Sequence, residues 1–591
     1  MYLEKLIIKN FRAIERLELD FDKGLNILIG ENNSGKTAVI DALRLCLGDF
    51  KQPRDIYCSQ SDFRIDKSKI DKKIQNIEFD LIFKCENEIE TAWFNSLHVL
   101  DANGNHSLQL HFKFELLDFK SDKRVKRSVW GGKYEGGKVP FEVRSALRNI
   151  YLGALRDANN KLRPTQSNIL GNLYSNIIIN EDKEENQKEK EKLLQLITDT
   201  LDEEEWSRFI KKGNESILEH LNYLSYLTPD KKQDVKISFA PLEFGKFVQK
   251  LIMQLPVYSD ESIDENHKQQ FFEIWQNGLG LNNLIYTATV LGDIKQKNKV
   301  YREEYNLLLI EEPEAHLHPQ LQNTFFNYLK ELDENEFQII VTSHSPTIAA
   351  KTDLNLLTIL QNDHNNISST QIKDLKLEDK SLKYLQKFLD VTKSQLFFAN
   401  GVILVEGISE AILIPIFSKI LAKKISEKYD IERNGIEVVN INGVAFEHFA
   451  KLFNSQDGNR LKCRCALVTD DDKGKAHAEA RIEKIMALES DNLKPLLGEI
   501  TFEYDLFKSN KDSKKVILDV FHEIHRNLHS QLIQIEDLNE QAKFFAEKLE
   551  SNDTKSEFAY LLAIELEKGK NLQNFKVPDY IKKSIQFVID D

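Results

Sequence analysis

One glycine-rich loop between an apolar strand and a helix constrains the fold of this chain more than any other segment. Residues 30–37 read GENNSGKT and fit the pattern GxxxxGK[ST] at every fixed position. The apolar run Leu25 to Ile29 precedes the loop, and residues 37–47 have the apolar spacing of a helix. A strand, a phosphate-binding turn and a helix N-terminus in series predict a nucleotide site in an α/β fold.

Each fixed position of this loop has a physical role. The glycines let backbone N–H groups turn inward around phosphates, and the helix N-terminus adds its dipole. Lys36 is expected to reach the β- and γ-phosphates, while the Thr37 hydroxyl holds Mg²⁺. We therefore predict that the chain binds ATP with one Mg²⁺ ion. The predicted nucleotide-binding residues are Gly30, Asn33, Ser34, Gly35, Lys36, Thr37 and Glu311.

A second apolar strand supplies the acidic partner of the loop. Residues 307–310 read LLLI and are followed by Glu311 and Glu312. A carboxylate at a strand end can bind Mg²⁺, and the next one can orient the attacking water. We expect Glu311, where Asp is usual, to hold the ion and Glu312 to act as the base. His344 follows the next apolar strand and is placed to sense the γ-phosphate; the alternative is an ordinary loop histidine.

A separate acidic set follows two later apolar strands. The run 402–405 ends at Glu406, and Glu410 lies four residues on, at the start of the next helix, so both carboxylates can face one point. The run 466–469 ends at Asp470, and alternation along the extended chain puts Asp472 on the same side. Because the C-terminal ends of parallel strands are neighbours, we expect these four carboxylates to converge.

Four converging carboxylates repel one another unless cations lie between them. Ligands that are all oxygen suit Mg²⁺ or Mn²⁺. Two such ions about 3.5–4 Å apart could activate water and stabilise the leaving oxygen in phosphodiester cleavage. The alternative is a solvated acidic loop, which is common in a chain with 94 Asp and Glu against 80 Lys and Arg. Because both acidic motifs follow apolar strands, we favour the metal site.

Composition excludes several other classes of protein. Five Cys in 591 residues do not form a disulfide framework, and His316 and His318 lack further ligands at zinc spacing. The N-terminal residues 1–19 carry Lys and Arg and have no apolar core of a signal peptide. No stretch is uniformly apolar enough for a membrane span. We expect a cytoplasmic protein with no membrane partner.

The nucleotide motifs resemble those of ATPases of the ABC type, including the segment 314–319 after the acidic pair. The family's LSGGQ-like signature is absent, and residues 278–284, GLGLNNL, occupy its place. We therefore expect slow ATP turnover. The later acidic set resembles a Toprim domain, a Rossmann-like α/β fold. Together they resemble the OLD (overcoming lysogenization defect) family of endonucleases, to which residues 397–407 and 151–157 are also similar.

The resemblance implies an α/β chain with an ABC-type ATPase domain followed by a Toprim nuclease domain. The ATPase is expected in residues 1–160 and 232–380, with a helical dimerisation insert at 161–231. A linker at 381–400 precedes the Toprim domain, 401–591, which has helical C-terminal additions. The family also implies that Glu503 binds the second metal ion and that Lys555 lies near the scissile phosphate, where it would stabilise developing charge.

The function implied is an ATP-regulated, metal-dependent DNA endonuclease in antiphage defence, similar to nuclease subunits of systems such as Gabija. The expected partners are DNA, a second copy of the chain, and a helicase or a retron-type reverse transcriptase element. The first alternative is an SMC-like DNA-repair ATPase whose Toprim-like domain does not cleave; its diagnostic would be ATPase activity without cleavage. The second is a topoisomerase or primase, which covalent protein–DNA adducts would reveal.

The net charge of −14 disfavours a protein that coats DNA by charge alone. It does not exclude a nuclease, because part of the acidity belongs to the proposed metal site. We expect weak, strongly salt-sensitive DNA binding that depends on metal and on dimerisation.

Overall fold

The computed structural model describes most of the chain in two compact units. The first unit comprises residues 1–151, 305–314 and 319–591, and the second comprises 152–304 and 315–318. The described residues are 1–48, 56–65, 74–100, 104, 106–119, 122–153, 162, 168–177, 183–201, 204–224, 242–256, 271–300, 305–315, 317–332, 337–363, 366–443, 445–454, 459–471, 478–569 and 574–590.

A six-stranded sheet holds the glycine-rich loop. Its strand order is β14-β13-β3-β12-β11-β8, and β11, β12, β3 and β13 pair in parallel. Buried parallel strands need apolar residues on both faces, which explains the continuous apolar runs. The strands are β3 Leu25–Gly30, β8 Leu147–Leu152, β11 Tyr305–Glu311, β12 Gln338–Ser343, β13 Leu357–Asp363 and β14 Asn366–Gln371. Helix α1, Lys36–Cys46, follows the loop as predicted.

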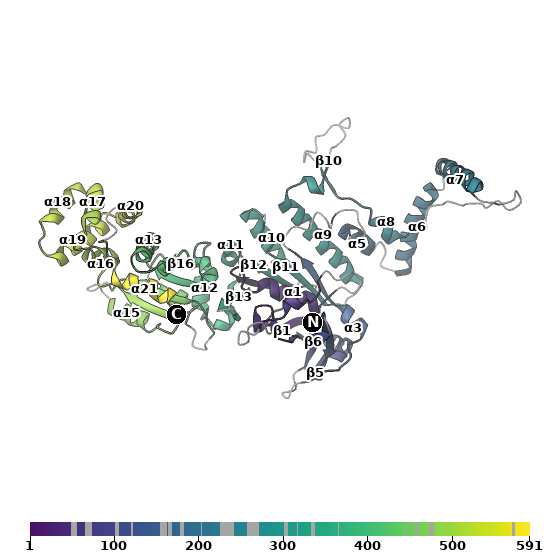
Figure 1. Cartoon of the computed structure of the whole chain (residues 1–591), viewed down its shortest axis with the longest axis horizontal. Coiled ribbons are helices and arrows are strands. Elements are labelled where there is room, and N and C mark those ends of the chain that lie inside the picture. Colours follow the sequence, from purple (N-terminus) through teal and green to yellow (C-terminus); the bar gives the residue numbers. More distant parts are fainter. Residues whose placement is uncertain are drawn as a thin grey trace. The chain divides into compact units, whose positions relative to one another are not determined.

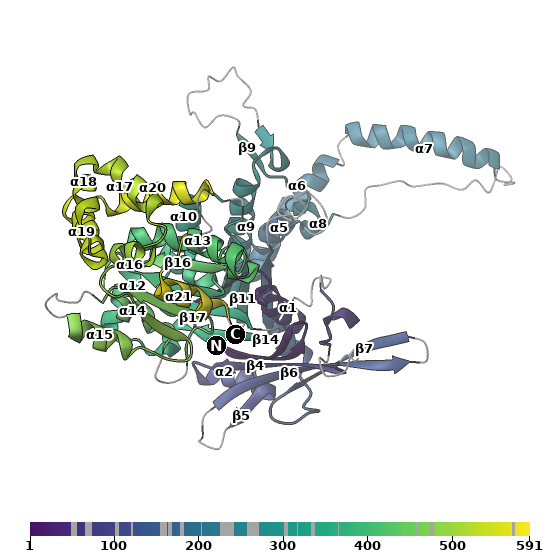
Figure 2. The same cartoon turned by 60° about the vertical axis from the view of Figure 1, so that its left-hand side comes forward.

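A second, antiparallel sheet shares a core with α1. Its order is β2-β1-β4-β6-β5, and β7 also pairs with β6, forming the long hairpin that Figure 2 shows. Burial alternates along β4, as expected for a sheet with one face on the core. These strands are β1 Tyr2–Phe11, β2 Ile14–Asp20, β4 Asn76–Lys84, β5 His98–Leu100, β6 His106–Phe119 and β7 Asp122–Gly131.

The later α/β part of the first unit is a four-stranded parallel sheet. Its order is β16-β15-β17-β18, with β15 Gly401–Val405, β16 Ile436–Asn440, β17 Arg464–Thr469 and β18 Leu493–Leu497. Helix α13, Ile408–Lys424, packs beside β16, and α21, Asp579–Ile589, packs across β15, β17 and β18 (Figure 1). The predicted Toprim-like sheet with adjacent ends of β15 and β17 is therefore confirmed.

Helices complete the first unit. Five of them, at the C-terminal end, are α16 Phe502–Ser509, α17 Lys515–Ile524, α18 Arg526–Gln534, α19 Leu538–Ser551 and α20 Lys555–Glu567. The others are α2 Glu88–Trp93, α3 Phe141–Ala146, α10 Pro319–Glu331, α11 Pro346–Lys351, α12 Asp379–Phe388, α14 Phe446–Ala450 and α15 Ala478–Met486. Helix α12 lies at the start of the segment 381–400 that we predicted as a linker.

The second unit is mainly helical where it is described. Helix α9, Leu279–Val300, packs against α5, Ile169–Asn176, where Asn176 donates to Asp293 at 2.7 Å. The remaining elements are α6 Lys183–Leu201, α7 Glu204–Leu224, α8 Phe244–Val248, β9 Gln254–Pro256 and β10 Phe271–Glu273. Among the described helices, none combines the length and the apolar character needed to cross a bilayer.

The C-terminal helices depend on a cluster of aromatic rings. Phe545 on α19 lies with its ring centroid 5.0 Å from Phe507, 5.2 Å from Phe521 and 5.1 Å from Phe558. We predict that Phe545→Ala destabilises the protein by about 3–5 kcal/mol, because it removes a fully buried ring and leaves a cavity. Thermal unfolding measures the effect. Phe544→Ala, which removes the neighbouring half-buried ring, is the control; an equal loss in both variants would contradict the prediction.

Candidate active sites

The glycine-rich loop has the geometry of a phosphate-binding turn. Gly30 has φ +155° and Gly35 has φ +95°, and a Cβ on Gly30 would collide with the main-chain oxygen of Leu360. The Lys36 ammonium donates to the main-chain oxygens of Gly30 at 2.9 Å and Glu31 at 2.7 Å. Burial lowers the pKa of Lys36 to about 8, although nearby carboxylates oppose the shift. An anionic phosphate would favour the ammonium form.

Glu311 is held at the end of β11 by two hydroxyl groups. Thr37 Oγ1 donates to Glu311 Oε1 at 2.6 Å, and the Tyr151 hydroxyl donates to Oε2 at 2.5 Å. The predicted pair of Mg²⁺ ligands, Thr37 and Glu311, is therefore brought together although the two lie 274 positions apart. Tyr151 was not predicted to have a role at this site. It also lies under the Arg44 guanidinium, whose Cζ is 3.7 Å from the ring centroid.

The predicted base and sensor contact each other. His344 Nε2 lies 2.9 Å from Glu312 Oε1, and Glu312 has a left-handed backbone with φ 46°. Burial, with the charge of Lys36, lowers the pKa of His344. Glu314, a carboxylate that we had not singled out, accepts from the Ser343 hydroxyl at 2.8 Å and from the His344 N–H at 2.7 Å. Burial raises the pKa of Glu314, which suits a positioning role.

The nuclease-like set begins at the adjacent ends of β15 and β17. Glu406 Oε1 accepts from the Thr469 hydroxyl and from Arg481 Nη1, the latter at 3.3 Å. Arg481 Nη2 also donates to the main-chain oxygen of Asp470. Arg481 thus links the two strand ends that we predicted to converge. Its role was not predicted from the sequence.

Two buried glutamates lie behind this edge. Glu410, in the first turn of α13, is 6% exposed, and Glu503, in the first turn of α16, is 3% exposed. Burial raises the pKa of Glu410 to about 7, and the charges of Glu503 and Glu406 add to the shift. Lys555 Nζ lies 3.5 Å from Glu503 Oε2 and 3.4 Å from Glu550 Oε2. Although burial opposes it, these carboxylates raise the pKa of Lys555.

A buried carboxyl and a buried phenol lie beside Asp470. A Cβ on Gly498 would lie 2.6 Å from Asp505 Oδ2, 3.3 Å from Tyr580 Cζ and 3.5 Å from Asp470 Oδ1, so a larger residue there would force the Asp505 carboxylate to move. Burial raises the pKa of Asp505 to about 6. The Tyr580 hydroxyl is buried and makes no hydrogen bond within the described part of the chain. Burial raises its pKa, and the charges of Asp470 and Asp505 add to the shift.

These donors fit a hard divalent cation in chemical type. The set consists of carboxylates that repel one another, beside the Tyr580 phenol that makes no hydrogen bond within the described residues. Oxygen ligands of this kind suit Mg²⁺ or Mn²⁺. In the described residues, no three acidic, His or Cys side chains lie close enough to hold one ion as they stand. Glu406 is turned toward Thr469 and Arg481, so ion binding requires side-chain rearrangement. The candidate ligands are Glu406, Glu410, Asp470, Glu503 and Asp505.

Some predicted residues are not tested by this arrangement. Asp472 and His316 lie outside the described residues. The segment 278–284, expected in place of the signature, forms the start of α9, where the Asn282 amide donates to the main-chain oxygen of Ile274 at 2.7 Å. Arg481, Asp505, Tyr151 and Tyr580 were missed. Only Asp505 had a local signal, because it follows Glu503 in the same acidic motif.

The raised pKa of Glu410 gives a pH prediction for the metal-free protein. The group holds its proton up to about pH 7 when folded but loses it near the ordinary value of 4.5 when unfolded. Stability should therefore fall as pH rises through this window, by about 3 kcal/mol. Glu410→Gln should remove that part of the pH dependence in unfolding curves recorded with chelator. Glu427→Gln, at an exposed site, should behave like wild type; parallel curves for all three proteins would refute the prediction.

Comparisons with known proteins match both halves of the chain. The family model for an AAA ATPase domain matches residues 1–349. The family model for the TOPRIM domain of overcoming-lysogenization-defect-like proteins matches residues 397–472.

Three relatives align with this chain over most of their length. The OLD nuclease of Thermus scotoductus is 25% identical over 426 residues, covering 69% of this chain and 72% of the relative. Endonuclease GajA of Bacillus cereus is 23% identical, covering 87% and 70%. The Old nuclease of Escherichia phage P2 is 23% identical, covering 90% and 91%. The chain belongs to the OLD family and is an ATPase–nuclease with an AAA ATPase domain followed by a TOPRIM domain.

Proposed function

We propose that this protein is an ATP-binding, divalent-metal-dependent DNA endonuclease whose ATPase domain regulates the nuclease. The observation that carries the proposal is the meeting of Glu406 and Asp470 at the ends of adjacent parallel strands. Glu410 and Glu503 are buried behind them, and Lys555 pairs with Glu503. Such a set is suited to phosphodiester cleavage. Apolar residues would stabilise the fold better than buried charged groups, so these residues point to a functional role.

The chain's own residues divide the work of cleavage. Glu406, Glu410, Asp470 and Glu503, with Asp472, would hold two Mg²⁺ or Mn²⁺ ions. Those ions, when bound, would activate water and stabilise the leaving oxygen. Lys555 is one-third exposed beside the buried glutamates, so its ammonium can reach a phosphate that lies over the site. Thr469 orients the Glu406 carboxylate through its hydroxyl.

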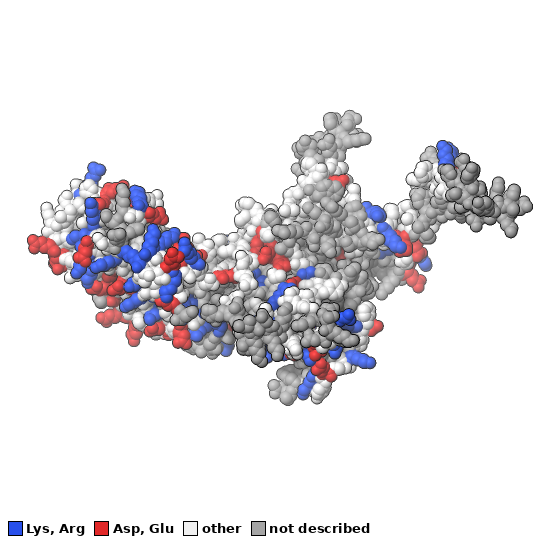
Figure 3. Space-filling model, viewed as in Figure 1, with Lys and Arg blue, Asp and Glu red and all other residues white. Residues whose placement is uncertain are grey.

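DNA is the proposed substrate because the relatives are nucleases and the site suits phosphodiesters. On the face that Figure 3 shows, Lys and Arg are interspersed with Asp and Glu over the C-terminal helices. Contact with DNA would therefore depend on the cations in the site more than on a basic surface. We further propose a role in antiphage defence, in the cytoplasm, as a homodimer or higher oligomer built through residues 161–231, with a helicase or reverse transcriptase element as partner.

ATP could act on the nuclease through β13, which touches the glycine-rich loop. β13 pairs in parallel with β3, and Leu360 lies opposite Gly30. Two residues later, Asn362 Nδ2 donates to the main-chain oxygen of Asn33, in the loop, at 3.3 Å. Nucleotide binding that shifts this loop would therefore shift the end of β13.

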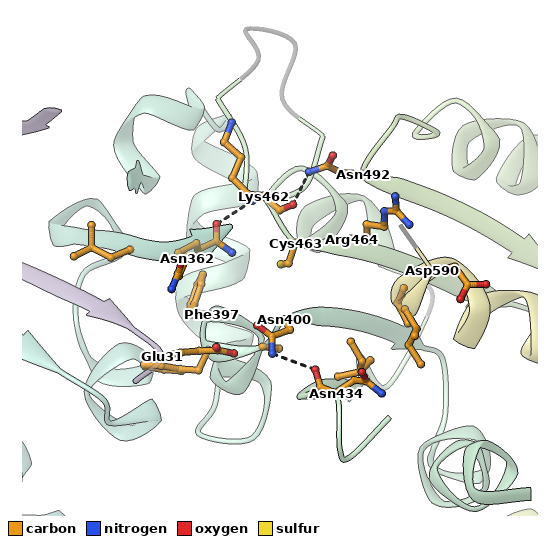
Figure 4. A pocket seen from close by; sticks show the side chains of 17 residues that line it. Glu31, Asn362, Phe397, Asn400, Asn434, Lys462, Cys463, Arg464, Asn492 and Asp590 are labelled. Carbon is orange, nitrogen blue, oxygen red and sulfur yellow. Dashed lines mark hydrogen bonds between the residues drawn. The ribbon is translucent and has the colours of Figure 1, made fainter. Parts of the chain in front are cut away.

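The same end of β13 contacts the strand that carries Asp470. Gln361 Oε1 accepts from the main-chain N–H of Lys462 at 2.9 Å, two residues before β17 begins. Figure 4 shows Asn362 and Lys462 at one side of a cavity of about 500 Å³, which Glu31 of the loop and Cys463 also line. The cavity leaves room for this contact to move, which supports regulation through β13.

Cleavage of plasmid DNA tests the proposed activity. We predict that the wild-type protein nicks or cuts plasmid with Mg²⁺ or Mn²⁺, and that Asp470→Ala lowers the rate by at least about 100-fold, because it removes a metal ligand. Asp491→Ala, at an exposed carboxylate of the same domain, is the matched control. Equal cleavage by the wild-type protein and the Asp470→Ala variant would show that the site is wrongly assigned.

Regulation through β13 predicts a variant that binds ATP but responds less to it. Gln361→Ala removes one hydrogen bond worth about 0.5–1.5 kcal/mol, so the factor by which ATP changes the cleavage rate should shrink by about 2- to 10-fold. ATP affinity, measured by calorimetry, should stay unchanged. Asn366→Ala, at an exposed position on β14, should retain the full response. An unchanged response in Gln361→Ala would exclude this route.

A further inference from the structure

Arg481 occupies an unusual place at the nuclease site. It projects from α15 to the ends of two adjacent strands, where Nη1 lies 3.3 Å from Glu406 Oε1 and Nη2 donates to the main-chain oxygen of Asp470. The side chains of Arg481 and Glu406 are only 19% and 18% exposed. A shielded ion pair of this kind interacts more strongly than a pair on the open surface.

The oxygen that Arg481 contacts belongs to one of the proposed metal ligands. Glu406 Oε1 receives both the Arg481 guanidinium and the Thr469 hydroxyl. Lys555, the other cation at the site, lies instead on Glu503 and Glu550. Within the described residues, Arg481 is thus the cation paired with Glu406.

Resting on the proposed metal-dependent nuclease, we infer that Arg481 is a positioning residue that competes with the divalent cation for Glu406. It ties the ends of β15 and β17 together through Glu406 and the Asp470 carbonyl. A divalent cation that binds Glu406 through Oε1 would displace the guanidinium, and one that binds through either oxygen would have to overcome its charge repulsion. The guanidinium can keep its bond to the Asp470 carbonyl and so remain beside the site.

Loss of the Arg481 guanidinium should change metal affinity and turnover in opposite directions. Removing the guanidinium removes the competitor, so divalent cations should bind more tightly. It also releases the two strand ends, so cleavage at saturating metal should slow, because small misplacements of catalytic groups are costly. A purely structural role would weaken metal binding and slow cleavage together.

Calorimetric titration of the full-length protein with Mn²⁺ tests this inference without relying on cleavage. We expect the dissociation constant for Mn²⁺ to fall by about 3- to 10-fold in Arg481→Met, the range for loss of a shielded charge contact. Cleavage by the same variant at saturating Mn²⁺ should fall by at least about 10-fold. Arg481→Lys keeps the charge and should bind Mn²⁺ within about twofold of wild type.

Lys484→Met is the matched control, because it removes an exposed charge from the same helix, one turn away. It should change neither quantity. Weaker or unchanged Mn²⁺ binding in Arg481→Met, with an unaltered melting temperature, would overturn the inference. Failure of every variant to bind Mn²⁺ would overturn the inference together with its site. Mn²⁺ affinities in the predicted order without any DNA cleavage would uphold the inference and overturn the proposed nuclease.

Discussion

Mutual repulsion among carboxylates at one edge of a parallel sheet is the constraint on which the later half of the molecule depends. Glu410 and Glu503 are nearly inaccessible to water, and burial raises the pKa of both. Buried carboxyl groups persist only when a proton, a basic side chain or a metal ion compensates them. Lys555 supplies part of that compensation through Glu503, and Arg481 pairs with the neighbouring Glu406. Protons or divalent cations must neutralise the remaining negative charge. The charge state of the site is therefore linked to its proposed function.

The two halves of the chain use the same architectural position for opposite electrostatic purposes. In the ATPase half, the C-terminal edge of the sheet presents backbone N–H groups and Lys36, which suit an anionic nucleotide. In the nuclease half, the corresponding edge presents carboxylates, which suit cations. The contact between Gln361 and Lys462 joins the end of β13 to the start of β17, the strand that Asp470 follows at its other end. The proposed regulation by nucleotide would act through this contact between packed strands.

Local patterns predicted the parts of both sites that lie at strand ends. The loop at 30–37, Glu311 and Asp470 each follow an apolar strand, and the parallel sheets bring them to the expected edges. Residues that reach the sites from elsewhere have no such signal. Tyr151 contacts Glu311 across 160 positions, and Arg481 lies on a helix whose sequence resembles any solvated helix. The role of Lys555 was predicted only from the resemblance to a family. Its pairing with Glu503 depends on tertiary packing and therefore has no local signal in the sequence.

The central claim is that Glu406 and Asp470 form a binding site for divalent cations. Anomalous X-ray scattering from crystals of the full-length protein grown with Mn²⁺ tests it most directly. We expect anomalous peaks within bonding distance of Glu406 and Asp470, about 2.0–2.2 Å from their carboxylate oxygens, with the Arg481 guanidinium moved off Glu406. Well-ordered side chains at saturating Mn²⁺ without a peak between these two strand ends would contradict it.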